Sequence, residues 1–65
     1  MIEYVVQYTT RSSGRVMYES SSAIAFGKTT SKIERARRWT SRAEAAAFAW
    51  ANEKPGVESR VVILT

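Results

Sequence analysis

Hydrophobic and polar residues alternate at the start of the chain, between residues 2 and 9. One set of alternate positions holds Ile2, Tyr4, Val6 and Tyr8, and the other holds Glu3, Val5, Gln7 and Thr9. These residue types favour strands, and a period of two places each set on its own face. The pattern predicts a first strand, with the tyrosine-rich face most simply explained as part of the core.

Three further apolar runs predict the other strands. The polar run 10–14 closes with a glycine and suits a hairpin connection into a second strand at residues 15–19. After three serines, the apolar residues 23–26 predict a third strand, and a polar turn at 28–31 follows Gly27. Residues 57–65 predict a final strand, with 61–64 buried on one or both faces.

A helix start is indicated by Ser41-Arg42-Ala43-Glu44, the pattern of a capping box. The alanine-rich run that follows has high helical propensity, and Pro55-Gly56 is expected to end the helix. Four positions share one face at helical spacing, namely Ala45, Phe48, Ala49 and Asn52. Phe48 is therefore expected to be the main apolar contact of the helix with the sheet, with Trp50 on a partly exposed flank.

Residues 32–39 support two interpretations. A second capping box at Ser31-Lys32-Ile33-Glu34 permits a short helix, whereas a strand would run into the cap at Ser41 with Trp39 turned toward the helix. A fresh N-cap at Ser41 implies that the chain was not already helical at Trp39, which favours the strand.

Together these elements predict one α+β domain spanning residues 1–65, a small antiparallel sheet of three to four strands packed on one helix in the order β-β-β-α-β. The chain has 65 residues and no cysteine or histidine. It therefore has neither a disulfide framework nor thiolate or imidazole metal ligands, and we expect no metal and no cofactor. Its stability must come from packing, or from self-association as a homodimer.

Catalysis is not expected from this composition. Without histidine or cysteine, the familiar pairs of nucleophile and base have no base. Of the acids, Glu44 has a capping role, and solvent-facing positions are expected for Glu3, Glu19, Glu53 and Glu58. We therefore predict that the protein is not an enzyme and that it acts by binding.

Positive charge is concentrated between residues 28 and 42. This segment carries six basic residues and one acid, a net charge of +5, whereas the whole chain carries +4. The predicted partner-binding residues are Lys28, Lys32, Arg35, Arg37, Arg38, Trp39 and Arg42. Such a block attracts an acidic protein surface, a nucleoprotein complex or a phosphate backbone. An exposed Trp39 or Trp50 would supply the apolar anchor of the interface.

Other interpretations of the same residues stay open. The basic block is also what a solvated face that maintains solubility would look like. The tyrosines with the arginines suggest nucleic-acid binding through stacking and phosphate contacts, although no recognised nucleic-acid signature is present. A structural or assembly subunit would join copies through an unpaired strand edge.

The apolar runs are far too short to span a bilayer, and the first ten residues lack the pattern of a signal peptide. We therefore expect a cytoplasmic protein with no membrane contact.

Residues 37–48, Arg-Arg-Trp-Thr-Ser-Arg-Ala-Glu-Ala-Ala-Ala-Phe, precede a turn and a valine-rich strand. This layout resembles small phage-encoded accessory proteins, including some anti-CRISPR proteins and phage inhibitors of host RNA polymerase. The resemblance covers about half the chain and implies a non-catalytic protein of a phage or mobile element, working in the host cytoplasm. Such a protein binds a host macromolecular complex and inhibits or redirects it. No site residue is transferred from the resemblance.

Overall fold

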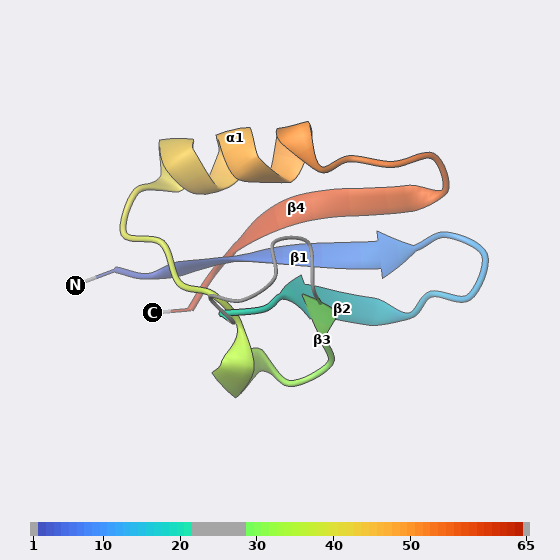
Figure 1. Ribbon diagram of the computed structural model, residues 1–65, viewed down its shortest axis with the longest axis horizontal. Helices are drawn as coiled ribbons and strands as arrows, with labels where there is room; N and C mark the ends of the chain where they lie inside the picture. The colour runs from blue at the N-terminus through green and yellow to red at the C-terminus, as the bar shows by residue number, and fades with distance from the viewer. Residues whose placement is uncertain (1, 22–28, 65) are drawn as a thin grey trace.

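In a computed structural model that describes residues 2–21 and 29–64, an antiparallel sheet lies against one α-helix (Figure 1). The elements are β1 (Tyr4–Thr10), β2 (Val16–Glu19), β3 (Thr29–Thr30), the 3-10 helix η1 (Ile33–Arg35), α1 (Arg42–Ala51) and β4 (Val57–Ile63). The strand order is β3-β2-β1-β4, so β4 forms one edge. The predicted α+β class and the order β-β-β-α-β are confirmed.

The hairpin between β1 and β2 forms where the polar run predicted it. The Gly14 N–H donates to the Thr10 carbonyl at 2.7 Å, and the Thr10 N–H donates to the Arg15 carbonyl at 2.9 Å. Gly14 has a φ of 70°, a left-handed conformation that costs glycine little. The resulting register sets Tyr8 opposite Met17, which places Met17 and Glu19 on the same sheet face as Tyr8.

The third strand differs from the prediction. Residues 23–26, where it was expected, lie outside the described residues. Thr29 and Thr30, expected in a polar turn, instead pair with Glu19 and Tyr18 of β2. Both residues are β-branched and fit a pleated strand, and β2 offers its outer edge to them.

The segment between β3 and α1 combines the two interpretations. Ile33–Arg35 form one 3-10 turn, which the favoured strand did not predict. The chain then becomes extended, with isolated bridges from Ala36 to Ser20 and from Trp39 to Tyr4. The Trp39 N–H donates to the Tyr4 carbonyl at 2.9 Å, and the reverse bond measures 2.8 Å. Residues 32–39 therefore form neither the predicted strand nor an α-helix: the second half is extended, as a strand would be, but makes only two isolated bridges.

Helix α1 begins where the capping pattern predicts, with the serine half of the capping box in place. Ser41 is extended, at φ −109° and ψ 119°, and its Oγ accepts a hydrogen bond from the Glu44 N–H at 3.2 Å. This bond satisfies one of the backbone donors that a helix start leaves unpaired.

Replacing Ser41 with alanine is therefore expected to lower the free energy of unfolding by about 0.5–2 kcal/mol. Urea denaturation followed by circular dichroism would measure the loss. Ser41→Asn, which keeps a capping oxygen, serves as the control and should stay close to the wild type. Equal losses in both variants would show that the cap does not contribute.

The helix ends earlier than Pro55-Gly56 predicts. Its last residue is Ala51, and Asn52 follows as the C-cap, with its Nδ2 donating to the Phe48 carbonyl at 2.9 Å. Pro55 and Gly56 instead belong to a turn that leads into β4, where the Val57 N–H donates to the Lys54 carbonyl at 3.1 Å. Gly56 adopts a φ of 79° there.

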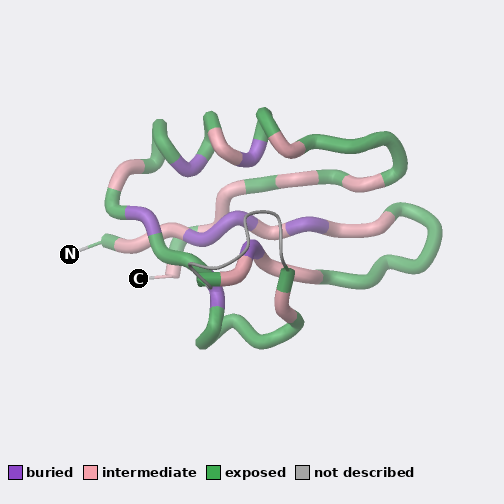
Figure 2. Tube along the Cα trace, viewed as in Figure 1, coloured by how far each residue is buried: buried purple, intermediate pink, exposed green. Residues whose placement is uncertain are grey.

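The core lies between α1 and the face of the sheet that carries Tyr8 (Figure 2). Its buried members are Val6, Tyr8, Trp39, Ala45 and Ala49, with Tyr4, Phe48, Val57 and Val61 packed against them. The predicted sheet-facing side of the helix is confirmed. The predicted burial of residues 61–64 is not, because β4 is an edge strand: Ile63 is 58% exposed and the others are only partly buried.

Candidate functional site

The predicted partner-binding residues occupy what we call the basic segment, residues 28–42. Lys28 lies outside the described residues. The side chains of Lys32, Arg35, Arg37, Arg38 and Arg42 are all exposed. The stretch runs through η1 and an extended connection whose side chains differ in burial: Ala36 and Trp39 are buried, whereas the basic side chains between and around them are exposed.

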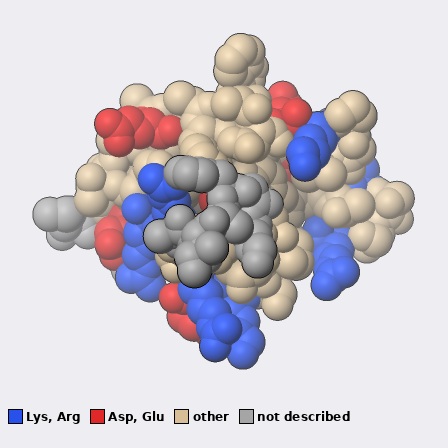
Figure 3. Space-filling model, viewed as in Figure 1, with Lys and Arg blue, Asp and Glu red and all other residues tan. Residues whose placement is uncertain are grey.

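The charges of the described part of the basic segment gather on one side of the molecule. In the view of Figure 3, basic side chains lie along the lower edge, over η1, and at the left, beside the extended connection to α1. Acidic side chains lie next to both groups. A second set of basic side chains lies on the right, toward the β1–β2 hairpin, and belongs to other parts of the chain.

Arg37 is held in place by aromatic rings. Its guanidinium carbon lies 5.1 Å from the centroid of the Trp39 ring and 5.7 Å from that of Phe48. Its backbone N–H donates to the Glu19 carbonyl at 2.8 Å. Cation–π contacts of this length fix the side chain without neutralising its charge. Arg37 therefore presents a positive charge in a defined position.

Two further arginines of the basic segment differ in the groups that surround their charges. Arg38 forms an ion pair with Glu3 at 3.3 Å, the one ion pair found among the described residues. Arg42 is the first residue of α1, where the positive end of the helix dipole disfavours a cation. Its charge therefore does not serve helix stability, which is consistent with an external role.

The role predicted for Trp39 as an exposed anchor is corrected by the structure. Only 7% of Trp39 is exposed, and its ring packs on Phe48 with centroids 5.2 Å apart. The bridge to Tyr4 turns the side chain into the core, where it can support Arg37 but cannot insert into a partner. The other tryptophan, Trp50, is 79% exposed.

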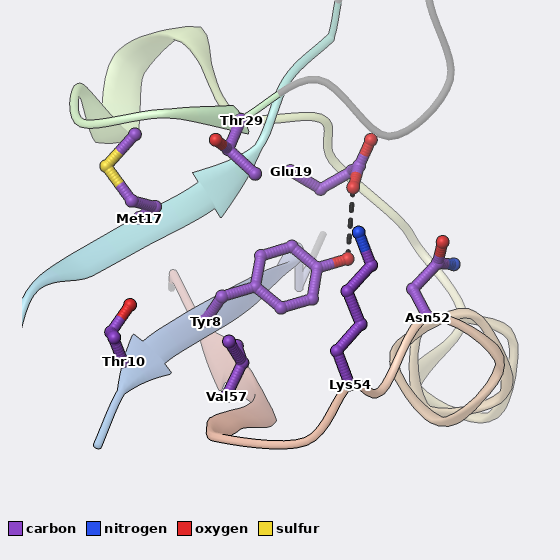
Figure 4. A pocket seen from close by; sticks show the side chains of 8 residues that line it. All are labelled: Tyr8, Thr10, Met17, Glu19, Thr29, Asn52, Lys54 and Val57. Carbon is purple, nitrogen blue, oxygen red and sulfur yellow. Dashed lines mark hydrogen bonds between the residues drawn. The ribbon is translucent and has the colours of Figure 1, made fainter. Parts of the chain in front are cut away.

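A cavity that the sequence did not suggest lies beside the helix, lined by residues of β1, β2, β3 and the turn that follows α1 (Figure 4). Its volume is about 210 Å³, and its lining residues are Tyr8, Thr10, Met17, Glu19, Thr29, Asn52, Lys54 and Val57. Small-molecule sites usually enclose about 300–1,000 Å³. The space therefore suits only a few atoms or one side chain.

A buried polar pair borders this cavity. Glu19 is 3% exposed, and its Oε1 accepts a hydrogen bond from the Tyr8 hydroxyl at 3.0 Å. Burial, together with the bond to the carboxylate and its charge, raises the pKa of Tyr8 well above its ordinary value of about 10. The solvent-facing position predicted for Glu19 is therefore wrong. Glu19 shares a sheet face with Met17, because side chains alternate along β2. This alternation indicates that Glu19 is buried only once Tyr8 is known to lie opposite Met17.

The chemistry of this cavity favours structure over reaction. A phenol with a raised pKa keeps its proton at neutral pH, so Tyr8 supplies neither a nucleophile nor a general base. Lys54 extends along the cavity with its amino group directed toward the Tyr8–Glu19 pair (Figure 4). The amide nitrogen of Asn52 is already bonded to the backbone of α1. The Tyr8–Glu19 hydrogen bond thus joins β1 and β2, while the Asn52 amide serves the end of α1.

Comparisons with protein-family models, with curated proteins and with solved structures gave no match. Within residues 2–21 and 29–64, no helix is long and apolar enough to cross a membrane.

Proposed function

We propose that this protein is a non-catalytic binding protein whose basic segment contacts an acidic surface of a host macromolecular complex. The observation that carries the proposal is the exposure of five cations between residues 32 and 42, of which only Arg38 is ion-paired among the described residues. Unpaired surface charge of one sign steers association with a surface of the opposite sign.

Two details support a binding role over a merely solubilising one. A solubilising face needs charge but no fixed geometry, whereas Arg37 is stacked against Trp39 and Phe48. Arg42 occupies a helix position that is unfavourable for a cation, so its placement costs some stability. Both details fit side chains retained for contact with a partner.

The layout of residues 37–48 extends this proposal to an identity. By its resemblance to small phage-encoded accessory proteins, the chain would belong to a phage or mobile element and act in the host cytoplasm. It would inhibit or redirect the complex that it binds by covering part of its surface. The absence of histidine and cysteine from the sequence supports occlusion rather than chemistry.

A charge-matched pair of variants tests the proposal. Lys32→Glu with Arg35→Glu reverses two exposed cations of the basic segment, and Arg11→Glu with Arg15→Glu reverses two exposed cations at the hairpin. Both double variants change the net charge by the same amount. Immobilised protein would capture partners from lysates of candidate host cells at about 50 mM salt, with and without nuclease.

We expect the basic-segment variant to capture at least about tenfold less partner than the wild type, and the hairpin variant to capture as much as the wild type. Equal capture by the two variants would contradict a role for the basic segment. Capture that disappears after nuclease treatment and weakens steeply with salt would instead identify a nucleic-acid phosphate backbone as the partner.

A further inference from the structure

The outer edge of β4 is open to pairing over only part of its length. Antiparallel pairing alternates, and the bond from the Leu64 N–H to the Glu3 carbonyl shows that even-numbered residues form the hydrogen-bonded pairs with β1. The main chains of the odd-numbered residues therefore point outward, and in the described part of the chain no strand lies beyond β4. Val57 is closed, because its N–H donates to the Lys54 carbonyl at 3.1 Å. The open stretch that remains consists of Ser59, Val61 and Ile63.

Two exposed apolar side chains lie along the open stretch. Ile63 is 58% exposed, and Trp50 of α1 is 79% exposed. Trp50 lines a groove of about 230 Å³ between α1 and β4, and residues 59–61 form the β4 side of this groove. The Ser59 Oγ donates to the Ala49 carbonyl at 3.1 Å, which sets Trp50 level with Ser59. One exposed apolar side chain therefore lies at each end of the open stretch.

We infer that this edge pairs with the same edge of a second copy of the chain, antiparallel and about a two-fold axis at Val61. Val61 is the midpoint of the open stretch, so an axis there pairs all three open residues. Ser59 faces the partner's Ile63, Val61 faces the partner's Val61, and Ile63 faces the partner's Ser59. Each of these pairs exchanges two N–H···O bonds, which gives about six main-chain hydrogen bonds. The bridge at Val57 lies just beyond this ladder and marks its end.

Other axes pair fewer of the open residues. An axis at Ser59 needs the main chain of Val57, which is closed. An axis at Arg60 sets the two arginines opposite each other, and like charges in that position are destabilising. An axis at Val62 leaves Ser59 without an open residue opposite it. Axes between residues set outward main chains against inward ones and break the ladder. The free main-chain groups therefore select the axis at Val61.

The side chains on the helix side of the sheet agree with this axis. The odd-numbered residues of β4 point toward α1, because Val61 packs in the core and Ser59 bonds to the helix. The partner's Ile63, opposite Ser59, therefore enters the groove and covers Trp50. The two-fold repeats this contact, so the dimer covers the exposed Ile63 and Trp50 of both copies.

The other contacts across the axis permit the same approach. On the far side of the sheet, Arg60 faces the partner's Val62 and Glu58 faces the partner's Leu64, so like charges are not directly opposite. Helix α1 packs against both β1 and β4, and strands lie about 4.8 Å apart, so the two helix axes would be roughly 10 Å apart. Packed helices lie at about 8–10 Å, and the small Ala46 side chain on the groove side leaves room.

Cysteine cross-linking tests the register, because the chain has no cysteine of its own. Opposite residues of an antiparallel pair without hydrogen bonds have Cα atoms about 4.5 Å apart, close enough for a disulfide. Arg60 and the partner's Val62 form such a pair, so Arg60→Cys combined with Val62→Cys should give a covalent dimer under a mild oxidant. Either variant alone should stay mostly monomeric. Efficient cross-linking of one single variant would place the axis at that residue and overturn the inference.

The exposed apolar pair is tested by association. In sedimentation experiments from about 5 μM to about 1 mM, we expect a dissociation constant on the order of 100 μM, consistent with a small interface. Ile63→Ser and Trp50→Ala should each weaken the dimer about tenfold. Ile33→Ser, the matched change of an exposed isoleucine in η1, should have no effect. A protein that is monomeric at about 1 mM, or a dimer insensitive to Ile63→Ser, would overturn the inference.

Hydrogen exchange locates the interface without any substitution. The amides of the open stretch, Ser59, Val61 and Ile63, should gain protection as the concentration rises. The Val62 amide, bonded to β1, and the Val57 amide, bonded to Lys54, should not change. Dimerisation without added protection at Val61 would show that the copies meet through another surface, and this result would also overturn the inference.

Discussion

Replacing Trp39 with alanine is expected to remove most of the stability of this domain. The side chain is 7% exposed and joins the start of β1, the basic segment and Phe48 of the helix. Losing a buried tryptophan costs about 3–5 kcal/mol, and a domain of this length has only about 3–10 kcal/mol in total. We expect a largely unfolded or weakly cooperative protein in thermal and urea denaturation followed by circular dichroism.

Trp50→Ala provides the matched control, because this substitution removes the same type of side chain from an exposed position. Trp50→Ala should change the free energy of unfolding by less than about 0.5 kcal/mol. Similar losses for the two variants would show that Trp39 is not a core residue.

The position of Trp39 shows what a sequence pattern can and cannot resolve. Its neighbours in sequence, Arg37 and Arg38, are exposed and charged, which suggested an exposed anchor at Trp39, although the strand interpretation of the same residues turns Trp39 toward the helix. Only pairing with Tyr4, 35 residues away in the chain, turns the indole ring toward the core. A contact of such sequence separation leaves no local periodicity to detect.

Elements specified by local chemistry were predicted well. The first strand, the hairpin at Gly14, the cap at Ser41 and the final strand each depend on residues within a few positions of one another. The end of α1 was missed because the Asn52 side chain bonds to the Phe48 carbonyl before the chain reaches Pro55. A proline predicts where a helix cannot continue, but not where it stops first.

The candidate sites also differ in whether the local sequence predicts them. Exposed cations can be recognised by composition, so the basic segment was found without a structure. The buried Glu19 and the cavity depend on the sheet order β3-β2-β1-β4 and on which strands α1 packs against. Helix α1 packs on β1 and β4, and no other helix of residues 2–21 and 29–64 lies on the cavity side of β2 and β3. No local pattern encodes that arrangement.

The Tyr8–Glu19 pair gives the second large expected effect, a change in how stability depends on alkaline pH. Unfolded tyrosine releases its proton near pH 10, whereas the folded protein retains the Tyr8 proton to higher pH. Above about pH 10 the unfolded chain therefore binds fewer protons, and the free energy of unfolding falls by up to about 1.4 kcal/mol per pH unit. Below pH 10 this contribution to stability is fully present.

Tyr8→Phe should remove that slope, and at neutral pH it should also cost about 1–3 kcal/mol, because the buried Glu19 carboxylate loses a hydrogen-bond donor. Urea denaturation at intervals between pH 8 and about pH 12 would measure both effects. Tyr18→Phe, which removes a phenol from the opposite face of the sheet, controls for the general effects of alkali on lysines and other groups. The curves of wild type and Tyr8→Phe should converge as pH rises, while that of Tyr18→Phe stays parallel to the wild type. Parallel curves for all three would mean that burial and the bond to Glu19 do not raise the pKa of Tyr8.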